Sequence, residues 1–189
     1  MSKEAKPKIS SDILKRARRI RLVLMDVDGV LTDGRLYNVP DAVGNMVETK
    51  AFDSQDGIAL QGLNWKGIQA GVISGRSSPA TEERCRQCKI AYVYQGHIEK
   101  IPVFEEILAK AGVQPDEVAY VGDDLTDLVI MRRVGLAIAT ANARPEVKRH
   151  AHWVTQGEGG RGAVREVVEL LLKAQGYWAE ILQKYEAVP

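Results

Sequence analysis

Short apolar segments alternate with helix-forming segments along most of this chain, and this alternation limits the folds available to it. Five segments have the length and composition of buried strands: residues 21–27, 68–74, 91–96, 117–122 and 136–140. Five others have helical character: residues 58–67, 78–89, 100–112, 125–135 and 162–176. Repeated strand–helix units of this length predict an α/β fold, a doubly wound parallel (Rossmann-like) sheet with helices on both faces.

One segment interrupts the alternation of strands and helices. Residues 33–53 contain β-prone residues around a turn-rich centre, NVPDAVGN, which predicts a β-hairpin inserted after the first strand. The 189 residues suit one domain with a sizeable core. We therefore expect residues 1–189 to form a single domain, with the hairpin as a small insert and no large cap domain.

The composition is that of an ordinary globular protein, with 45% hydrophobic and 27% charged residues. No apolar run approaches the roughly 20 residues that a membrane span needs. The polar start, MSKEAKPKISSD, lacks the apolar stretch of a signal peptide. We therefore expect a cytoplasmic protein with no membrane partner.

The N-terminal segment is basic although the net charge of the chain is only +1. Residues 1–21 hold eight basic and two acidic residues, a pattern that also suits nucleic acid or anionic lipid. However, Ile13, Ala17 and Ile20 share one helical face after the cap-forming residues Ser11 and Asp12. We prefer a helix that packs on the core and exposes its arginines.

Cys85 and Cys88 form a C-x-x-C pair late in a predicted helix. A thioredoxin-like motif places its first cysteine at a helix start, and a zinc site needs two further ligands. The chain has no other cysteine, so we expect two reduced thiols without a function.

Polar side chains follow the predicted strands at the sheet edge where ligands bind in this class of fold. They lie at strand ends or in the first turn of the following helix, and they are Asp26, Asp28, Ser74, Lys100, Asp123, Asp124 and Asp127. Such a dense group of carboxylates is costly to keep without a cation, and hard oxygen ligands beside a phosphate suit Mg²⁺. The sequence therefore predicts a magnesium site that also receives a phosphate group.

This set of residues resembles the haloacid dehalogenase superfamily of phosphotransferases. The matching motifs, in chain order, are D-x-D-G-V at 26–30, Ser74 in VISGR, Lys100, and G-D-D-x-x-D at 122–127. The resemblance implies that Asp26 is the nucleophile that accepts the phosphoryl group. It implies that Asp28 is the general acid/base, which protonates the leaving oxygen and then activates water.

The same resemblance implies ligands for the phosphate and the metal. A carboxylate attacks phosphorus only when the negative charge of the phosphate is neutralised. The implied phosphate ligands are Ser74, Gly75 and Lys100. The implied Mg²⁺ ligands are Asp26, Asp28 through its backbone carbonyl, and Asp123, with Asp124 and Asp127 orienting them from the second layer.

A closer resemblance covers nearly the whole chain. The segments ISSDILKRARRIRLVLMDVDGVLTDG, KAFDSQDG, YVYQG, YVGDDLTD and GGRGAVREVVELLLKAQG are similar to the 3-deoxy-D-manno-octulosonate 8-phosphate phosphatase family of lipopolysaccharide precursor synthesis. The resemblance implies a Mg²⁺-dependent homotetramer whose hairpins form a central barrel, and a phosphorylated sugar acid as substrate. The residues expected near that substrate are Arg35, Asp56, Arg76 and Arg161.

Three alternative functions stay open at this point. The family motif F-N-V-R-D-G reads FDSQDG here, and Gln55 in place of arginine suggests a nine-carbon sialic-acid-type 9-phosphate as substrate. A non-catalytic oligomerisation module, as in cytidylyltransferase fusions, is opposed by the intact acidic motifs. A nucleic-acid end phosphatase is opposed by the lack of a basic track with stacking aromatics, so we expect no nucleic acid partner.

Overall fold

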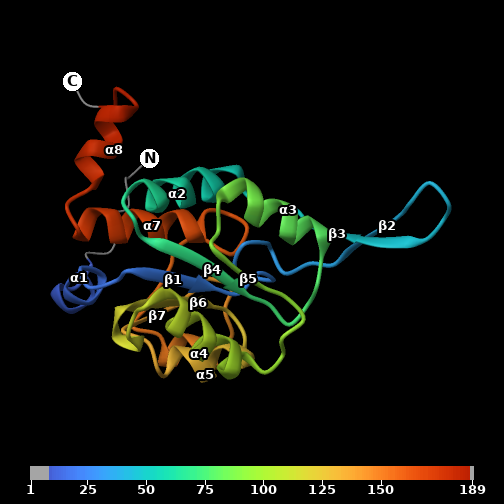
Figure 1. The fold of residues 1–189 in the computed structure, drawn as a ribbon, viewed down its shortest axis with the longest axis horizontal. Helices are drawn as coiled ribbons and strands as arrows, with labels where there is room; N and C mark the ends of the chain where they lie inside the picture. The colour runs from blue at the N-terminus through green and yellow to red at the C-terminus, as the bar shows by residue number, and fades with distance from the viewer. Residues whose placement is uncertain (1–8, 188–189) are drawn as a thin grey trace, which may run out of the picture.

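The structure, a computed structural model, describes residues 9–187, and its centre is a six-stranded sheet (Figure 1). Neighbouring strands all run parallel, in the order β5–β4–β1–β6–β7–β8. They are β1 (Leu22–Met25), β4 (Gln69–Ile73), β5 (Tyr92–Tyr94), β6 (Val118–Gly122), β7 (Leu136–Ala139) and β8 (Trp153–Val154). The strand order reverses at β1, the point beyond which open α/β sheets bind ligands.

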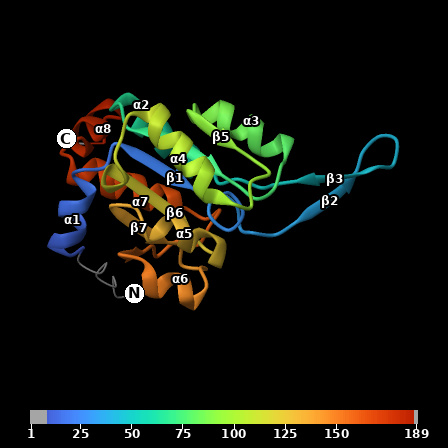
Figure 2. The same ribbon diagram turned by 60° about the horizontal axis from the view of Figure 1, so that its bottom comes forward.

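Helices cover both faces of the sheet, as Figure 2 shows from a second direction. One face packs against α1 (Ser11–Ala17), α2 (Ser54–Trp65), α3 (Pro79–Cys88), α7 (Ala163–Ala174) and α8 (Trp178–Lys184). The other packs against α4 (Lys100–Ala111), α5 (Leu128–Met131) and α6 (Pro145–His150). In β1, Val23 and Met25 are buried on the first face, and Leu22 and Leu24 on the second. This burial on both faces confirms the predicted doubly wound sheet.

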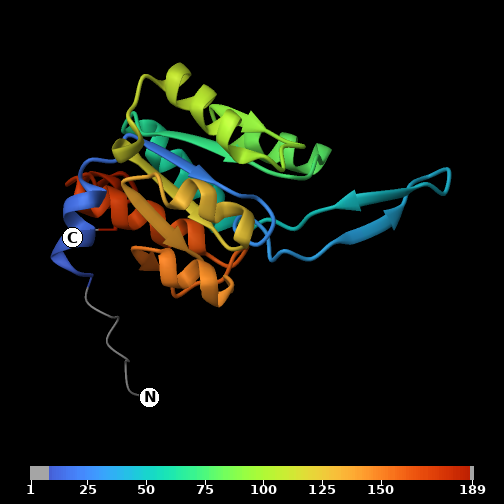
Figure 3. The ribbon, with the colours of Figure 1, turned by 90° about the horizontal axis from the view of Figure 1, so that it is seen from below.

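A two-stranded antiparallel hairpin projects from the body of the molecule in all three views (Figure 3). Its strands are β2 (Tyr37–Pro40) and β3 (Met46–Thr49), in a register that pairs Val39 with Val47. Nearly all of its residues are exposed. The small insert that the sequence predicted after the first strand is therefore confirmed.

Several elements differ from their expected bounds. The α2 helix begins at Ser54 rather than at residue 58, because the Asp53 side chain accepts a hydrogen bond from the Gln55 N–H and caps the helix. The helix expected over residues 125–135 is a 3₁₀ turn, η2 (Leu125–Asp127), followed by the short α5. The sequence analysis did not predict α6, β8, α8 or the 3₁₀ turn η1 (Pro115–Glu117). Among residues 9–187, no helix is long and apolar enough to cross a membrane.

The N-terminal helix packs on the core as expected, but with a different cap. Ile13 and Ala17 are buried on the face of the sheet that α7 covers. The cap is Ser10, whose hydroxyl accepts from the Ile13 N–H at 3.3 Å, and not Ser11 or Asp12.

The two cysteines are free and buried within α3. Burial raises the pKa of the Cys85 thiol to about 12, so this thiol is almost entirely protonated near neutral pH. Since the thiolate is the reactive form, Cys85 is a weak nucleophile and packs as a small apolar side chain.

Substitution of a fully buried isoleucine tests the assigned core. Ile107 in α4 has no exposed surface, whereas Ile58 in α2 is 51% exposed. We expect Ile107→Ala to lower the free energy of unfolding by about 2–5 kcal/mol, because it removes buried surface and leaves a cavity. Ile58→Ala, the matched control, should cost less than about 1 kcal/mol. Denaturant unfolding measures both, and similar losses would show that the core is assigned wrongly.

Candidate active site

The first acidic side chain of the candidate site lies directly after β1. The Asp26 N–H donates to the Val121 carbonyl at 3.0 Å, which continues the pairing of β1 with β6 by one residue. The chain then turns, and the Thr32 N–H donates back to the Val27 carbonyl at 3.1 Å. Because of this turn, the side chains of Asp26 and Asp28 reach the same pocket.

A glycine is required at the tightest point of this turn. Gly29 has a φ of +91°, in the left-handed region that side chains rarely adopt. A Cβ atom at this position would also lie 2.1 Å from Asp123 Oδ2. Both the backbone conformation and the close approach of the Asp123 side chain therefore favour glycine at this position.

Lys100 begins α4, and its side chain is only 2% exposed at the edge of the sheet. Its Nζ donates to Asp26 Oδ1 at 3.0 Å, to Asp127 Oδ1 at 2.7 Å and to the Tyr120 hydroxyl at 3.2 Å. A buried ammonium group is costly unless it is paired, and two carboxylates pair with this one. Lys100 thereby holds one oxygen of Asp26.

Sequence reasoning missed Tyr120, because a tyrosine within an apolar strand is usually a core residue.

The Asp127 carboxylate uses its acceptor positions within the protein. Its Oδ1 accepts from Lys100 and from the Tyr120 hydroxyl, at 2.7 and 2.8 Å. Its Oδ2 accepts from the backbone N–H groups of Asp123 and Asp124, at 2.9 and 3.1 Å. Asp127 is fully buried and shapes the loop that carries Asp123, rather than offering a free oxygen to a ligand.

Three carboxylates lie close enough to share a cation. One oxygen each of Asp26, Asp123 and Asp127 lies within 4.8 Å of the other two. Among residues 9–187, Asp123 Oδ1 is buried and has no hydrogen-bond partner, whereas the oxygens of Asp127 are already engaged. Buried polar atoms are rarely left without a partner. A free hard oxygen beside a second carboxylate fits Mg²⁺, which Asp26 and Asp123 would hold.

Burial and mutual repulsion oppose ionisation of this cluster. Burial is the main cause that raises the pKa of Asp123 to about 8, and repulsion from Asp127 and Asp26 adds to it. Burial likewise raises the pKa of Asp26 to about 6, although the Lys100 charge opposes this shift. A bound cation would favour the charged form of both carboxylates.

The pocket at the strand ends brings together most of the predicted site residues. Its volume is about 280 Å³, and the predicted residues that line it are Asp26, Asp28, Ser74, Gly75, Arg76, Lys100, Asp123 and Asp124. Gly34, Ile98 and Thr126 also line it, and the sequence analysis did not single them out. Ser74 is buried at 2% exposure, and its Oγ accepts from the Arg76 N–H at 3.2 Å, which orients the hydroxyl group.

Three residues expected near the substrate lie outside this pocket. Asp56 is buried in the first turn of α2, where it accepts from the Arg165 N–H at 2.7 Å and joins α2 to the start of α7. Arg35 is 71% exposed at the base of the hairpin. Arg161 is also exposed, beside Glu158. The family resemblance placed all three near the substrate, and that role stays a prediction.

The GGRG segment supports the turn after β1 through its backbone. A Cβ on Gly159 would lie 1.9 Å from the Gly29 carbonyl oxygen, and the Gly160 N–H donates to the Val30 carbonyl at 3.1 Å. Asn142 completes the contact, since its Nδ2 donates to Gly29 O at 3.0 Å and its Oδ1 accepts from the Gly159 N–H at 2.7 Å. Gly159 and Gly160 therefore allow this segment to pack closely against the backbone of the turn after β1. Asn142, a polar residue in a loop, carried no signal in the sequence.

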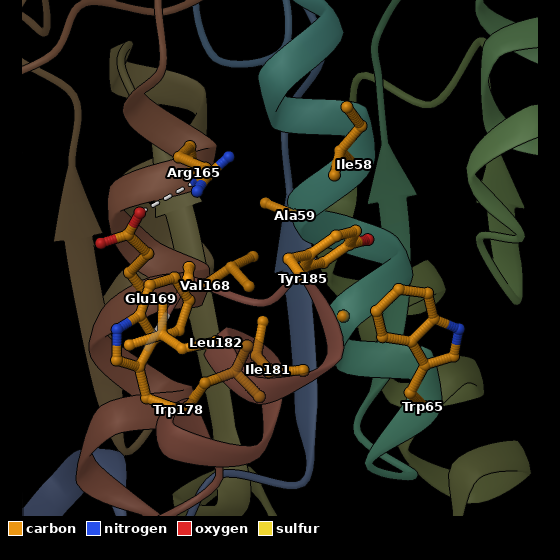
Figure 4. Close-up of a pocket in the computed structure, with 13 residues that line it drawn as sticks. Ile58, Ala59, Trp65, Arg165, Val168, Glu169, Trp178, Ile181, Leu182 and Tyr185 are labelled. Atoms are coloured by element: carbon orange, nitrogen blue, oxygen red, sulfur yellow. Dashed lines mark hydrogen bonds and ion pairs between the residues drawn. The ribbon is translucent and has the colours of Figure 1, made fainter. Parts of the chain in front are cut away.

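A second cavity, of about 300 Å³, lies between α2, α7 and α8, away from the strand ends (Figure 4). Trp65, Trp178 and Tyr185 line it together with aliphatic side chains. Its one cationic side chain among residues 9–187, Arg165, is paired with Glu169 at 2.9 Å. The described residues of this apolar cavity offer no unpaired cation for a phosphate, so the acidic pocket is the candidate active site.

The pKa shifts predict that Mg²⁺ stabilises the protein in a pH-dependent way. In the unfolded chain Asp26 and Asp123 lose their protons near pH 4, whereas their pKa values in the folded protein are about 6 and 8. Between about pH 4 and pH 8 the metal-free folded protein therefore binds more protons than the unfolded chain. Its free energy of unfolding therefore falls as the pH rises through this range. Since Mg²⁺ relieves the repulsion, we expect it to raise the Tm more at pH 8 than at pH 6 in calorimetry against EDTA-treated protein.

The variant Asp123→Asn provides the control for this measurement. It removes the charge that burial disfavours most, so the metal-free variant should have a higher Tm than the metal-free parent at pH 8. It should also lose most of the stabilisation by Mg²⁺. Equal Mg²⁺-induced shifts at both pH values in the parent protein would contradict the raised pKa values.

Comparisons with known proteins agree with this geometry. A family model described as haloacid dehalogenase-like hydrolase matches residues 86–166. The 3-deoxy-D-manno-octulosonate 8-phosphate phosphatase KdsC of Escherichia coli (strain K12) is 44% identical over 168 residues, which cover 89% of this chain and 87% of that protein.

Solved structures of 3-deoxy-D-manno-octulosonate 8-phosphate phosphatases are also similar to this chain. The crystal structure of 3-deoxy-D-manno-octulosonate 8-phosphate phosphatase from Yersinia pestis is 42% identical, with a TM-score of 0.84 and 89% of both chains covered. The Moraxella catarrhalis enzyme, in complex with a magnesium ion, a phosphate ion and a KDO molecule, is 37% identical, with a TM-score of 0.87 over 94% of this chain and 99% of that one. This chain therefore belongs to the 3-deoxy-D-manno-octulosonate 8-phosphate phosphatase family of haloacid dehalogenase-like hydrolases.

Proposed function

We propose that this chain, as one phosphatase domain with a hairpin insert, is a Mg²⁺-dependent phosphomonoesterase. It hydrolyses 3-deoxy-D-manno-octulosonate 8-phosphate to 3-deoxy-D-manno-octulosonate and phosphate, in lipopolysaccharide precursor synthesis. The observation that carries the proposal is one pocket in which buried Lys100 holds Asp26 beside Asp123, whose Oδ1 has no partner in the described part of the chain. The names of the Escherichia coli, Yersinia pestis and Moraxella catarrhalis relatives support the substrate.

In the first proposed step, Asp26 attacks phosphorus. Lys100 engages Oδ1 of Asp26, which leaves Oδ2 for the attack. The Ser74 hydroxyl, the Gly75 backbone and Lys100 bind the phosphate oxygens, and Asp28 gives a proton to the departing sugar oxygen. When bound, Mg²⁺ neutralises charge on the phosphate and so allows a carboxylate to approach it.

In the second proposed step, water releases the phosphoryl group from Asp26. Asp28, now deprotonated, takes a proton from the water molecule that attacks phosphorus. The phosphorus–oxygen bond to Asp26 breaks, phosphate leaves, and both carboxyl groups return to their starting state. Asp127 takes no part in bond making; it holds the loop that carries Asp123.

Arg76 is the proposed contact to the acidic part of the sugar. It lines the pocket, and its side chain is about half exposed. A guanidinium group matches the geometry of a carboxylate better than an ammonium group does. Gln55, the departure from the family motif, is exposed in the first turn of α2 and does not line the pocket.

Phosphate release with Mg²⁺ tests this function. We expect a kcat/KM for 3-deoxy-D-manno-octulosonate 8-phosphate at least about 10-fold above that for a nine-carbon sialic-acid-type 9-phosphate and for a hexose phosphate, a difference of about 1.4 kcal/mol in transition-state binding. A preference for the nine-carbon substrate would overturn the assigned sugar but keep the phosphatase chemistry.

Two asparagine variants control this measurement. Asp26→Asn should lower turnover by at least about 10³-fold, because it removes the proposed nucleophile. Asp116→Asn, at an exposed position in η1 outside the pocket, should leave turnover unchanged. Normal turnover by Asp26→Asn would contradict the nucleophile assignment, and no phosphate release by the parent from any of the three substrates would contradict the proposed function.

The hairpin is the proposed site of assembly into a symmetric homotetramer. Its exposed apolar residues are Leu36, Tyr37, Val39, Val43, Met46 and Val47. A two-stranded ribbon is marginally stable by itself, and exposed apolar surface with open strand edges is typical of interaction sites. The tetramer and the cytoplasmic location both remain predictions.

Sedimentation velocity tests the proposed assembly. The double variant Val39→Ser, Val47→Ser changes a cross-strand pair whose members are 47% and 43% exposed. We expect it to reduce the sedimenting species from a tetramer to smaller forms, because it removes apolar surface from the interface. Val129→Ser, on α5 with 39% exposure, is the matched control and should leave the tetramer intact. An unchanged profile for the double variant would contradict assembly through the hairpin.

A further inference from the structure

A second lysine with a buried side chain lies at the base of the hairpin. Lys50 directly follows β3, and its side chain is only 2% exposed. Lysine is almost never fully buried unless it is paired. Lys50 forms an ion pair with Asp28 Oδ1 and lies 3.1 Å from Glu48 Oε1. It does not line the pocket, so it reaches Asp28 from outside the space that a substrate would occupy.

Asp28 depends on this lysine for its orientation. Within residues 9–187, the Asp28 carboxylate has no other hydrogen bond or ion pair. Its side chain is 19% exposed and lines the pocket. Since Lys50 engages Oδ1, Oδ2 is the oxygen that stays available for proton transfer. Each of the two acidic residues after β1 therefore has its own lysine, Lys100 for Asp26 and Lys50 for Asp28.

Glu48 links the same lysine to the rim of the pocket. Its Oε1 lies 3.1 Å from Lys50 Nζ, and its Oε2 lies 3.6 Å from Arg76 Nη1. Charges of alternating sign therefore run from Asp28 through Lys50 and Glu48 to Arg76. It connects the loop after β1, the base of the hairpin and the loop after β4, so a shift of β3 would move the Asp28 carboxylate.

We propose that Lys50 is a positioning residue for proton transfer. It holds the Asp28 carboxylate in the orientation in which Oδ2 gives a proton to the departing sugar oxygen and later takes one from water. This inference rests on the proposed function, because it assigns to Lys50 an action on the general acid/base of that reaction.

The dependence on the leaving group separates this role from a structural one. A sugar alkoxide leaves only with a proton, whereas p-nitrophenolate leaves without one. Moreover, kcat/KM reports only the steps up to the departure of the alcohol or phenol, so the later hydrolysis does not obscure the comparison. We expect Lys50→Met to lower kcat/KM for the sugar-acid phosphate by roughly 10- to 100-fold, and for p-nitrophenyl phosphate by less than about 3-fold.

Two lysine variants serve as controls. Lys100→Met should lower kcat/KM for both substrates, because it removes a charge that binds the phosphate itself. Lys66→Met removes a lysine that is ion-paired with Glu180 near α8, outside the pocket, and should change neither. Equal losses on both substrates for Lys50→Met would overturn the positioning role in favour of a general structural one.

A double-mutant cycle supplies a second readout that does not depend on the leaving group. If Lys50 acts through Asp28, the double variant Lys50→Met, Asp28→Asn should have the same kcat/KM as Asp28→Asn alone. Losses that multiply would overturn the inference. A parent enzyme that cleaves p-nitrophenyl phosphate but not the sugar-acid phosphate would instead overturn the proposed function. In that case, an alkyl phosphate that the enzyme does cleave would replace the sugar-acid phosphate when the kcat/KM of Lys50→Met is compared with that of the parent.

Discussion

The buried charge cluster around Lys100 is the interaction on which the rest of the site depends. One ammonium and two carboxylates are removed from water at the carboxyl edge of the sheet, and each would be costly by itself. Together they satisfy one another, while Asp127 uses its second oxygen to hold the backbone at Asp123 and Asp124. The end of β1, the start of α4 and the loop after β6 are therefore fixed relative to one another before a ligand binds, which is what electrostatic catalysis requires.

Backbone packing allows these loops to come so close together. A Cβ at Gly122 would lie 2.5 Å from the Asp127 Cβ, and one at Gly159 would overlap the Gly29 carbonyl. The GGRG loop therefore packs backbone against backbone on the turn after β1, and the Asp127 side chain packs directly on the backbone of Gly122. Burial and the repulsion from Asp127 and Asp26 raise the pKa of Asp123, which explains why the cluster fits a divalent cation.

The strand-end residues were predictable because parallel strands place their carboxyl ends at one edge. Asp26, Ser74 and Lys100 therefore meet in one pocket, although more than seventy positions separate the first from the last. Lys50 was not predictable, because a lysine in an exposed hairpin is usually solvated, and only the path of the chain buries it against Asp28. Asp56, also predicted near the substrate, lies outside the pocket, since its carboxyl group accepts from the Arg165 N–H at the start of α7.

The sequence by itself determined the class of fold, the family and the acidic motifs. These depend on local periodicity and on residue types at strand ends, both of which are written into short segments. Only the tertiary structure decided which carboxylates are already engaged, which lysine holds which aspartate, and which arginine lies at the pocket. Those outcomes depend on distances between segments far apart in the chain, where a shift of one or two ångströms separates an ion pair from a solvated side chain.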